Sequence, residues 1–193
     1  LLVRQLLAPA FQQDQRLALV CHEEQFDRLL GSLASHVLDV VIADAPVPPD
    51  SEKTLFNHVL GESTVTLVAP TKLAPALRKN FPASVSEVPL MLPLVGSALR
   101  RNLDAWMTKE GVSPEIVAEA EDSALLKALA ADGMGAMFVP TVIAKTVARR
   151  YDLAEVAEIE TVHERYYAIT AERRLVHPAV IAIRSAARAE LFG

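Results

Sequence analysis

With 193 residues, the chain is long enough to bury a sizeable hydrophobic core, as one domain or as two small lobes. A hydrophobic fraction of 51% and a charged fraction of 22% are typical of a folded globular protein and exclude a disordered chain. The net charge of −5 disfavours direct binding to nucleic acid, because DNA phosphates are held by an excess of Lys and Arg.

The sequence predicts helices and strands that alternate along the chain. Apolar side chains three and four residues apart indicate helices, and runs of β-branched and other apolar residues that stop at Gly or Pro indicate strands. In chain order, we expect a helix at residues 1–13, a strand at 16–22, a helix at 23–36, a strand at 37–44, two extended segments within 54–70, a strand at 90–96, a helix at 97–111, a strand at 114–120, a helix at 122–133, a strand at 134–140, a helix at 141–151, a strand at 163–174 and a helix at 177–192.

This alternation predicts an α/β fold with parallel strands covered on both faces. Two series of such elements are joined once by residues 61–70, where Gly61 separates the two extended segments, and again by residues 164–173. We therefore expect two Rossmann-like lobes, the second inserted into the first. Because open α/β sheets bind ligands beyond the carboxyl ends of their strands, a cleft between the lobes is the expected binding site.

The stretch DGMGAMFVP at residues 132–140 raises a choice between a phosphate-binding loop and a structural turn. A Walker loop needs two glycines with four residues between them, followed by Lys and Ser or Thr, and a dinucleotide loop needs three glycines between a strand and a helix. Here the glycines follow a helix and precede a strand. We interpret Gly133 as the left-handed residue that ends the helix and Gly135 as a sharp turn into the strand.

The sequence has no pattern of an enzyme. Cys21 and His22 are adjacent, so on a strand they point to opposite faces and cannot pair as a catalytic dyad. Cys21 is expected to be buried and structural. The histidines show no spacing of a zinc site, and no GxSxG motif occurs. We therefore expect neither catalysis nor a cofactor.

Acidic residues stand where predicted strands end. Glu23 and Asp27 follow the strand at 16–22, Asp44 ends the strand at 37–44, and Asp122 follows the strand at 114–120. Each has the alternative role of a helix cap or a solvated acid. Serines that begin helices, at positions 97 and 123, could instead hold an anion through free N–H groups. The charge of the ligand stays open on these grounds.

The order of segments resembles a known family. The runs LDVVIAD and EAEDSALLKALAADGMGAMFVP, the crossing strand before ERR, and the closing HPAV helix resemble the effector-binding domain of LysR-type transcriptional regulators. The stretches EDSALLKAL and YYAITAERRLVHPAV and the final ELF are similar to the NhaR-type subgroup, which activates sodium/proton antiporter genes. The resemblance extends from Leu1 to Phe192.

The resemblance implies two lobes of the periplasmic-binding-protein-like type, linked by two crossing strands. The first lobe would comprise residues 1–62 and 171–193, and the second residues 63–170. A small effector would bind between the lobes, at Glu23, Asp27, Asp44, Gly96, Ser97, Asp122, Ser123, Phe138 and Thr141. If the effector is sodium or lithium, the expected ligands are the oxygens of Glu23, Asp27, Asp44 and Asp122.

The resemblance also implies partners. Family domains pair head to tail, here through the first helix, residues 16–22 and residues 141–150, as homodimers that assemble into a tetramer in the full regulator. DNA binding would belong to an N-terminal winged helix-turn-helix, which lies outside this chain together with the domain's first strand.

A single cysteine, and the lack of a membrane span or signal peptide in the sequence, lead us to expect a cytoplasmic protein with no membrane partner. The alternatives are a solute-binding protein of a transport system, which has the same two-lobe plan, and an enzyme that uses the acids as a general base. The sequence upstream of this chain would separate the first alternative from the regulator, and the geometry of the site would test the second.

Overall fold

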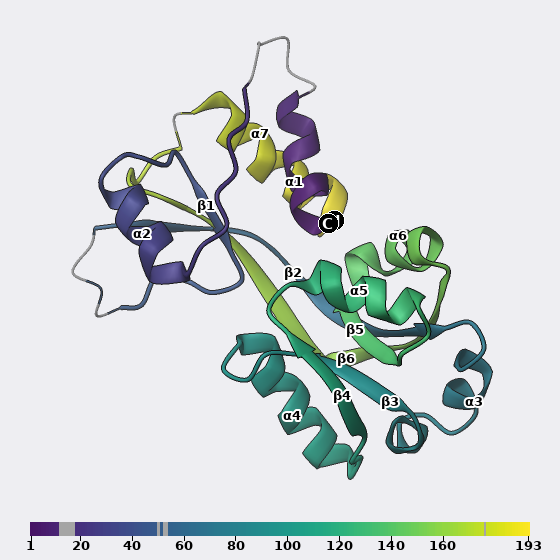
Figure 1. The fold of residues 1–193 in the computed structure, drawn as a ribbon. Helices are drawn as coiled ribbons and strands as arrows, with labels where there is room; N and C mark the ends of the chain where they lie inside the picture. Colours follow the sequence, from purple (N-terminus) through teal and green to yellow (C-terminus); the bar gives the residue numbers. More distant parts are fainter. Residues whose placement is uncertain (12–17, 50, 52–53, 176) are drawn as a thin grey trace. The chain divides into compact units, whose positions relative to one another are not determined.

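A computed structural model describes residues 1–11, 18–49, 51, 54–175 and 177–193 (Figure 1). Helices and strands alternate as expected from residue 89 to residue 186, whereas the described part before residue 71 has two helices followed by two strands. The elements are α1 (Leu2–Phe11), α2 (Phe26–Ala34), β1 (Val41–Ala43), β2 (Phe56–Pro70), α3 (Ala74–Lys79), the 3₁₀ helix η1 (Ala83–Glu87), β3 (Pro89–Pro93), α4 (Ala98–Glu110), β4 (Glu115–Ala120), α5 (Ser123–Ala131), β5 (Ala136–Pro140), α6 (Thr141–Tyr151), β6 (Leu153–Thr170), α7 (Pro178–Ala186) and the π-helix η2 (Ala187–Leu191).

The strands are hydrogen-bonded in the order β1-β6-β2-β5-β3-β4. The α/β class is confirmed, but the expectation of wholly parallel strands is wrong. β3 is parallel to β4 and to β5, whereas β1 pairs with β6 and β2 pairs with β5 in antiparallel fashion. The two strands of each antiparallel pair are far apart in the chain, with other strands between them, so no single strand-helix-strand unit makes them parallel.

Two compact units share these strands. One comprises Leu1–Glu62 and Arg165–Gly193, and the other comprises Ser63–Glu164. The chain passes from one unit to the other twice, once within β2 and once within β6, which are visibly the longest strands in Figure 1. The expected break at Gly61 is wrong, because β2 is continuous through it. A Cβ atom at Gly61 would lie 2.2 Å from the ring of Phe192, so this glycine makes room for a side chain rather than a turn.

The unit of Leu1–Glu62 and Arg165–Gly193 has cores built around its helices. α1 packs against α7 with Leu6 and Ile183 buried between them, and α2 buries Leu33 against β1. The strand expected at residues 16–22 is wrong in its described part. Residues 18–22 form no strand and are exposed, Cys21 included. An apolar segment becomes a strand only where a neighbour accepts its backbone hydrogen bonds, and no described strand pairs with it.

The unit of Ser63–Glu164 has one large core. Trp106 of α4 stacks on Phe81 and meets Phe138 of β5 edge-on, with ring centroids 5.9 Å apart in both pairs. α4 ends at Gly111 in the left-handed conformation, and Gly133 adopts the positive φ predicted for it after α5. A Cβ atom at Gly135 would lie 2.5 Å from the carbonyl oxygen of Pro89, so close strand approach is what requires that glycine.

Some elements have no counterpart in the sequence-based expectation. α3 and η1 are too short to show a clear apolar period, and β6 begins at Leu153, well before the expected start at residue 163. In the described parts of the chain, no helix has the length and apolar character needed to cross a membrane.

Candidate functional site

The predicted acids of the first unit lie at element ends. Asp27 is in the first turn of α2, Glu23 lies in the segment before it, and Asp44 directly follows β1. All three side chains are exposed. Among the described residues, no three acidic, histidine or cysteine side chains come close enough to hold a metal ion. These acids do not form a preformed metal cluster.

Gly96 and Ser97 shape the start of α4 in the second unit. Gly96 has a φ of +100°, which a residue with a Cβ adopts only with strain, and the chain turns there into the helix. The Ser97 hydroxyl accepts a hydrogen bond of 3.1 Å from the backbone N–H of Arg100. Ser97 is therefore the N-cap of α4, which is the structural role that polar residues at this position commonly have.

Asp122 and Ser123 form the start of α5. The Asp122 carboxylate accepts the backbone N–H of Ala124 at 2.7 Å and caps the helix with one oxygen. The Ser123 hydroxyl accepts a hydrogen bond of 2.8 Å from the Lys127 ammonium, which also donates to the Ser123 carbonyl at 3.1 Å. Both predicted residues have defined partners, and Lys127 joins them as a residue that the sequence analysis missed.

Lys127 is unusual because only 4% of its surface is exposed. Burial lowers the pKa of its ammonium, and the negative charges of Asp122 and Glu164 act in the opposite direction. One pattern in the sequence could have found it. In the helix SALLKALAA it is the only charged residue, and it shares a helical face with Ala130, three residues later.

Phe138 and Thr141 lie at the end of β5 and the start of α6. Phe138 is 4% exposed and its ring belongs to the core around Trp106. The Thr141 hydroxyl oxygen lies 2.9 Å from the hydroxyl oxygens of both Thr64 and Thr66. Thr66 and Thr141 line a hollow of about 530 Å³ beside α6, together with Lys145, Glu155 and Glu158. Thr141 is therefore hydrogen-bonded within its own unit.

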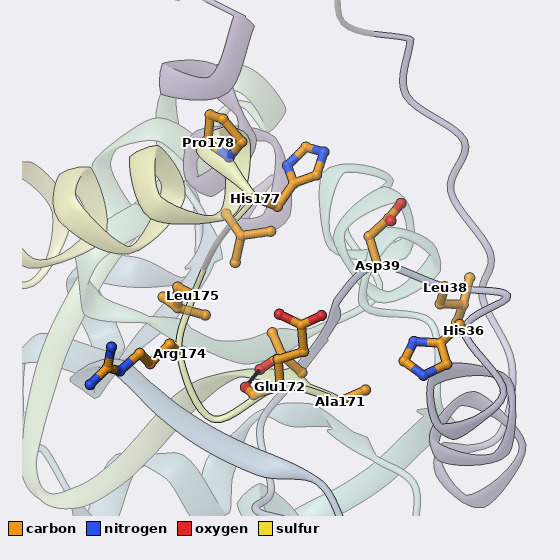
Figure 2. A pocket seen from close by; sticks show the side chains of 11 residues that line it. His36, Leu38, Asp39, Ala171, Glu172, Arg174, Leu175, His177 and Pro178 are labelled. Atoms are coloured by element: carbon orange, nitrogen blue, oxygen red, sulfur yellow. Dashed lines mark hydrogen bonds between the residues drawn. The ribbon is translucent and has the colours of Figure 1, made fainter.

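The first unit has a pocket of about 370 Å³ that was not predicted from the sequence. Figure 2 shows His36, Asp39, Glu172 and His177 around it, with the Glu172 carboxylate and the His177 ring directed to the open space. The hydroxyl of Thr170, which also lines the pocket, donates to the Glu172 carbonyl and lies 2.9 Å from the His58 ring. The lining mixes imidazoles and carboxylates with apolar side chains.

Comparison with known proteins identifies what this arrangement resembles. Residues 1–191 match the family model described as the LysR substrate binding domain. The chain is 34% identical over 191 residues to the transcriptional activator protein NhaR of Escherichia coli K12, and to the protein of the same name from Shigella flexneri. Each alignment covers 99% of this chain, which spans 62% of the length of these relatives.

Solved structures share the fold at low sequence identity. The regulatory domain of HypT from Salmonella typhimurium in its apo-form has a TM-score of 0.70 and 18% identity, with 97% of this chain and 91% of that chain covered. The effector binding domain of QuiR in complex with shikimate has a TM-score of 0.66 and 15% identity, with 96% and 88% covered. A reduced form of OxyR from N. meningitidis has a TM-score of 0.68 and 16% identity, with 100% and 90% covered.

Proposed function

Because the chain belongs to the family of LysR substrate-binding domains, we propose that it senses the effector of a DNA-binding transcriptional regulator. A member of this family is a regulatory, effector-binding domain and not an enzyme. The two-lobe α/β fold is the one that the resemblance implied. The observation that carries the proposal is the family match over residues 1–191, together with the 34% identity to a transcriptional activator.

The proposed effector is sodium or lithium, and the proposed targets are sodium/proton antiporter genes. Two observations support this: the similarity to NhaR over 99% of the chain, and the exposed carboxylates of Glu23, Asp27 and Asp44. Small hard cations bind carboxylate and carbonyl oxygens. Asp122 is the fourth proposed ligand, through the carboxylate oxygen that does not cap α5. Since no three acids are preassembled in the described residues, carbonyl oxygens and water would complete the coordination.

The proposed mechanism needs no covalent chemistry. The effector binds one arrangement of the two lobes more tightly than another, and this difference in affinity shifts the population of arrangements. β2 and β6 are the two strands through which such a change would pass. In the full-length regulator, which we propose to be a cytoplasmic tetramer of paired homodimers, the shift would alter the spacing of DNA-binding domains outside residues 1–193.

Thermal unfolding of the chain in sodium, lithium and potassium chloride at equal ionic strength tests the proposed effector. A ligand that binds only the folded state stabilises that state and so raises the unfolding midpoint. The stabilisation is about 2.7 kcal/mol at a ligand concentration one hundred times the Kd. We expect sodium and lithium to raise the midpoint above its value in potassium. Equal midpoints in all three salts would contradict ion sensing by this chain.

Substitution of Asp122 separates its role as a cap from its proposed role as an ion ligand. Asp122→Asn keeps an oxygen that can accept the Ala124 N–H but removes the charge, whereas Asp122→Ala removes both. We expect Asp122→Ala to lose about 1 kcal/mol of stability and Asp122→Asn to lose little. Both variants should show a smaller sodium shift than the unchanged chain. A full sodium shift in Asp122→Asn would exclude Asp122 as a ligand.

A further inference from the structure

The pocket of about 370 Å³ in the first unit lies at one end of the β1–β6 pair. Val41 of β1 pairs with Ile169 of β6 in antiparallel fashion, so the residues before β1 and the residues after β6 come to the same end of the pair. The pocket is lined by residues between 36 and 39 from one segment and between 170 and 180 from the other. Asp44, which is assigned to the effector, follows β1 at its opposite end. None of the residues assigned to the effector lines this pocket.

Five charged or titratable side chains surround the pocket: His36, Asp39, Glu172, Arg174 and His177 (Figure 2). Within the described part of the chain, none of these five side chains forms a hydrogen bond or an ion pair. All five residues are exposed, so a ligand can reach them from solvent. Carboxylates and a guanidinium are therefore both available for binding at one pocket.

The wall that carries Glu172 is held by hydrogen bonds of a buried side chain. The Thr170 hydroxyl donates to the Glu172 carbonyl at 2.7 Å and lies 2.9 Å from Nε2 of His58. Thr170 is only 7% exposed. These bonds fix the chain where it leaves β6, and they leave the Glu172 carboxylate unused. A backbone that is already fixed loses less conformational freedom when a ligand binds.

The mixture of charges disfavours a simple ion as the ligand. A small anion meets the carboxylates of Asp39 and Glu172, and a metal cation meets the Arg174 guanidinium, and like charges brought together cost binding energy. No three acidic, histidine or cysteine side chains of the described residues are placed to hold a metal ion. A molecule that carries both charges meets an opposite charge at each end. The pocket volume of about 370 Å³ lies within the roughly 300–1,000 Å³ that is usual for sites of small molecules.

We infer that this pocket binds a small zwitterion, namely an α-amino acid with an apolar side chain. Its ammonium pairs with the Glu172 carboxylate and its carboxylate pairs with the Arg174 guanidinium, through charge-assisted hydrogen bonds. Its apolar side chain packs on Leu38, Leu175 and Val180, which belong to the apolar part of the lining. Because the pocket lies outside the residues assigned to the effector, the inference goes beyond the proposed function and adds a second ligand.

Charges that only keep the surface hydrated make a different prediction. In that case an amino acid stabilises the chain only as a solute that is excluded from protein surfaces, and this general effect is the same whichever exposed charge is removed. Binding in the pocket instead depends on both Glu172 and Arg174. Since neither side chain has a partner among the described residues, replacing it with Gln leaves the fold intact.

The test is thermal unfolding of the 193-residue chain in L-valine, L-leucine and L-methionine at fixed pH and ionic strength. 4-Methylpentanoate and 3-methylbutylamine are the ligand controls, because each keeps only one of the two charges of L-leucine. The variants are Glu172→Gln and Arg174→Gln. Glu160→Gln and Arg149→Gln are the matched controls, because both residues are exposed in the other unit and pair with no described group.

We expect at least one amino acid to raise the midpoint of the unchanged chain and of both control variants, and neither single-charge analogue to do so. Glu172→Gln and Arg174→Gln should lose most of this rise, while their midpoints without amino acid stay near that of the unchanged chain. The inference is wrong if none of the three amino acids raises the midpoint, if both pocket variants keep the full rise, or if a single-charge analogue raises the midpoint as much as L-leucine does.

The sodium series described above separates this inference from the proposed function. A midpoint that rises with sodium but with no amino acid retains the proposed cation and refutes the pocket ligand. A midpoint that rises with an amino acid through Glu172 and Arg174, but not with sodium, retains the pocket ligand and refutes the proposed cation. A rise that survives both pocket variants and is lost in Ser97→Ala would assign the amino acid to the proposed effector residues and overturn the inference.

Discussion

Gly61 shows how a single absent side chain fixes the packing of β2. A Cβ atom there would lie 2.2 to 2.4 Å from three carbon atoms of Phe192, whose ring stacks on Tyr166 with centroids 5.6 Å apart. Forcing extra atoms into a packed place costs about 1–3 kcal/mol. We therefore expect Gly61→Ala to lower the free energy of unfolding by that amount, as measured by urea denaturation.

A double substitution tests the cause. In Phe192→Ala the ring is gone, so adding Gly61→Ala to that background should cost little further stability. Gly133→Ala is the control. Nothing lies within 4 Å of a Cβ at Gly133, but its φ is +88°, so its cost of about 1 kcal/mol comes from the backbone and should be unchanged by Phe192→Ala. Equal costs of Gly61→Ala in both backgrounds would refute the packing explanation.

At the scale of single residues, the sequence predicts the roles that depend on neighbours along the chain but not those that depend on tertiary contacts. The left-handed conformation of Gly133 and the capping role of Ser97 and Asp122 follow from rules that depend only on neighbours along the chain. Gly61 could not be interpreted correctly, because the ring that requires it comes from the far end of the chain. Lys127 was missed although it is the only charged residue of its helix, because a lysine is normally exposed and the tertiary structure shows this one buried.

At the scale of elements, His58 links β2 to the end of β6. Its Nε2 lies 2.9 Å from the Thr170 hydroxyl. Burial lowers the pKa of His58, as does the positive charge of Arg184, while a hydrogen bond with the Glu172 backbone acts in the opposite direction. The unfolded chain therefore binds a proton at His58 more readily than the folded chain does. The stability that His58 contributes is full above pH 6.5, the ordinary pKa, and is lost as the pH falls below it toward the folded value.

The lowered pKa of His58 predicts a pH dependence of stability that a variant without this histidine lacks. We expect the unfolding midpoint of the unchanged chain to fall between pH 7 and pH 5 more steeply than that of His58→Gln, so that the two midpoints converge at low pH. Arg184→Gln removes one cause of the lowered pKa and should make the fall less steep. Parallel pH profiles for the unchanged chain and His58→Gln would contradict this role.

The sequence predicts those helices and strands whose apolar spacing and end signals lie within their own residues. α4, α5 and α6 have apolar spacing and end signals within their own residues, and they lie where the sequence places them. Residues 18–22 have the composition of a strand but not the partner that a strand requires. The early start of β6 was missed because Glu155 and Glu158 stand three residues apart in its first half, so charged and apolar side chains do not alternate there as in a clear strand.

At the scale of the whole molecule, the cores belong to separate units. The core around Trp106 uses residues between Val65 and Val162 only, whereas the cores around Leu6 and Leu33 use residues of Leu1–Glu62 and Arg165–Gly193. The sequence predicted the two lobes from the repeated order of elements and from the family resemblance. It could not predict the pocket around His36 and Glu172, because that pocket joins segments whose proximity depends on the pairing of β1 with β6.

Separate cores predict unequal responses to substitutions in each unit. Leu33 and Leu103 are both fully buried, one in each unit, and replacing either with Ala should cost about 2–5 kcal/mol locally. The only tryptophan of the chain, Trp106, reports on Ser63–Glu164 alone. We expect Leu103→Ala to lower the urea midpoint of tryptophan fluorescence clearly more than Leu33→Ala does.

Hydrogen exchange measured on separate peptides gives the complementary observation. Leu33→Ala should raise exchange mainly in α2 and β1, and Leu103→Ala mainly in β3 and α4, since local openings follow the loss of local packing. β2 and β6 run through both units, so their amides should respond to both substitutions. If each substitution raised exchange equally in every element, the chain would unfold as one cooperative body. The cores of the two units would then not act as separate folding units.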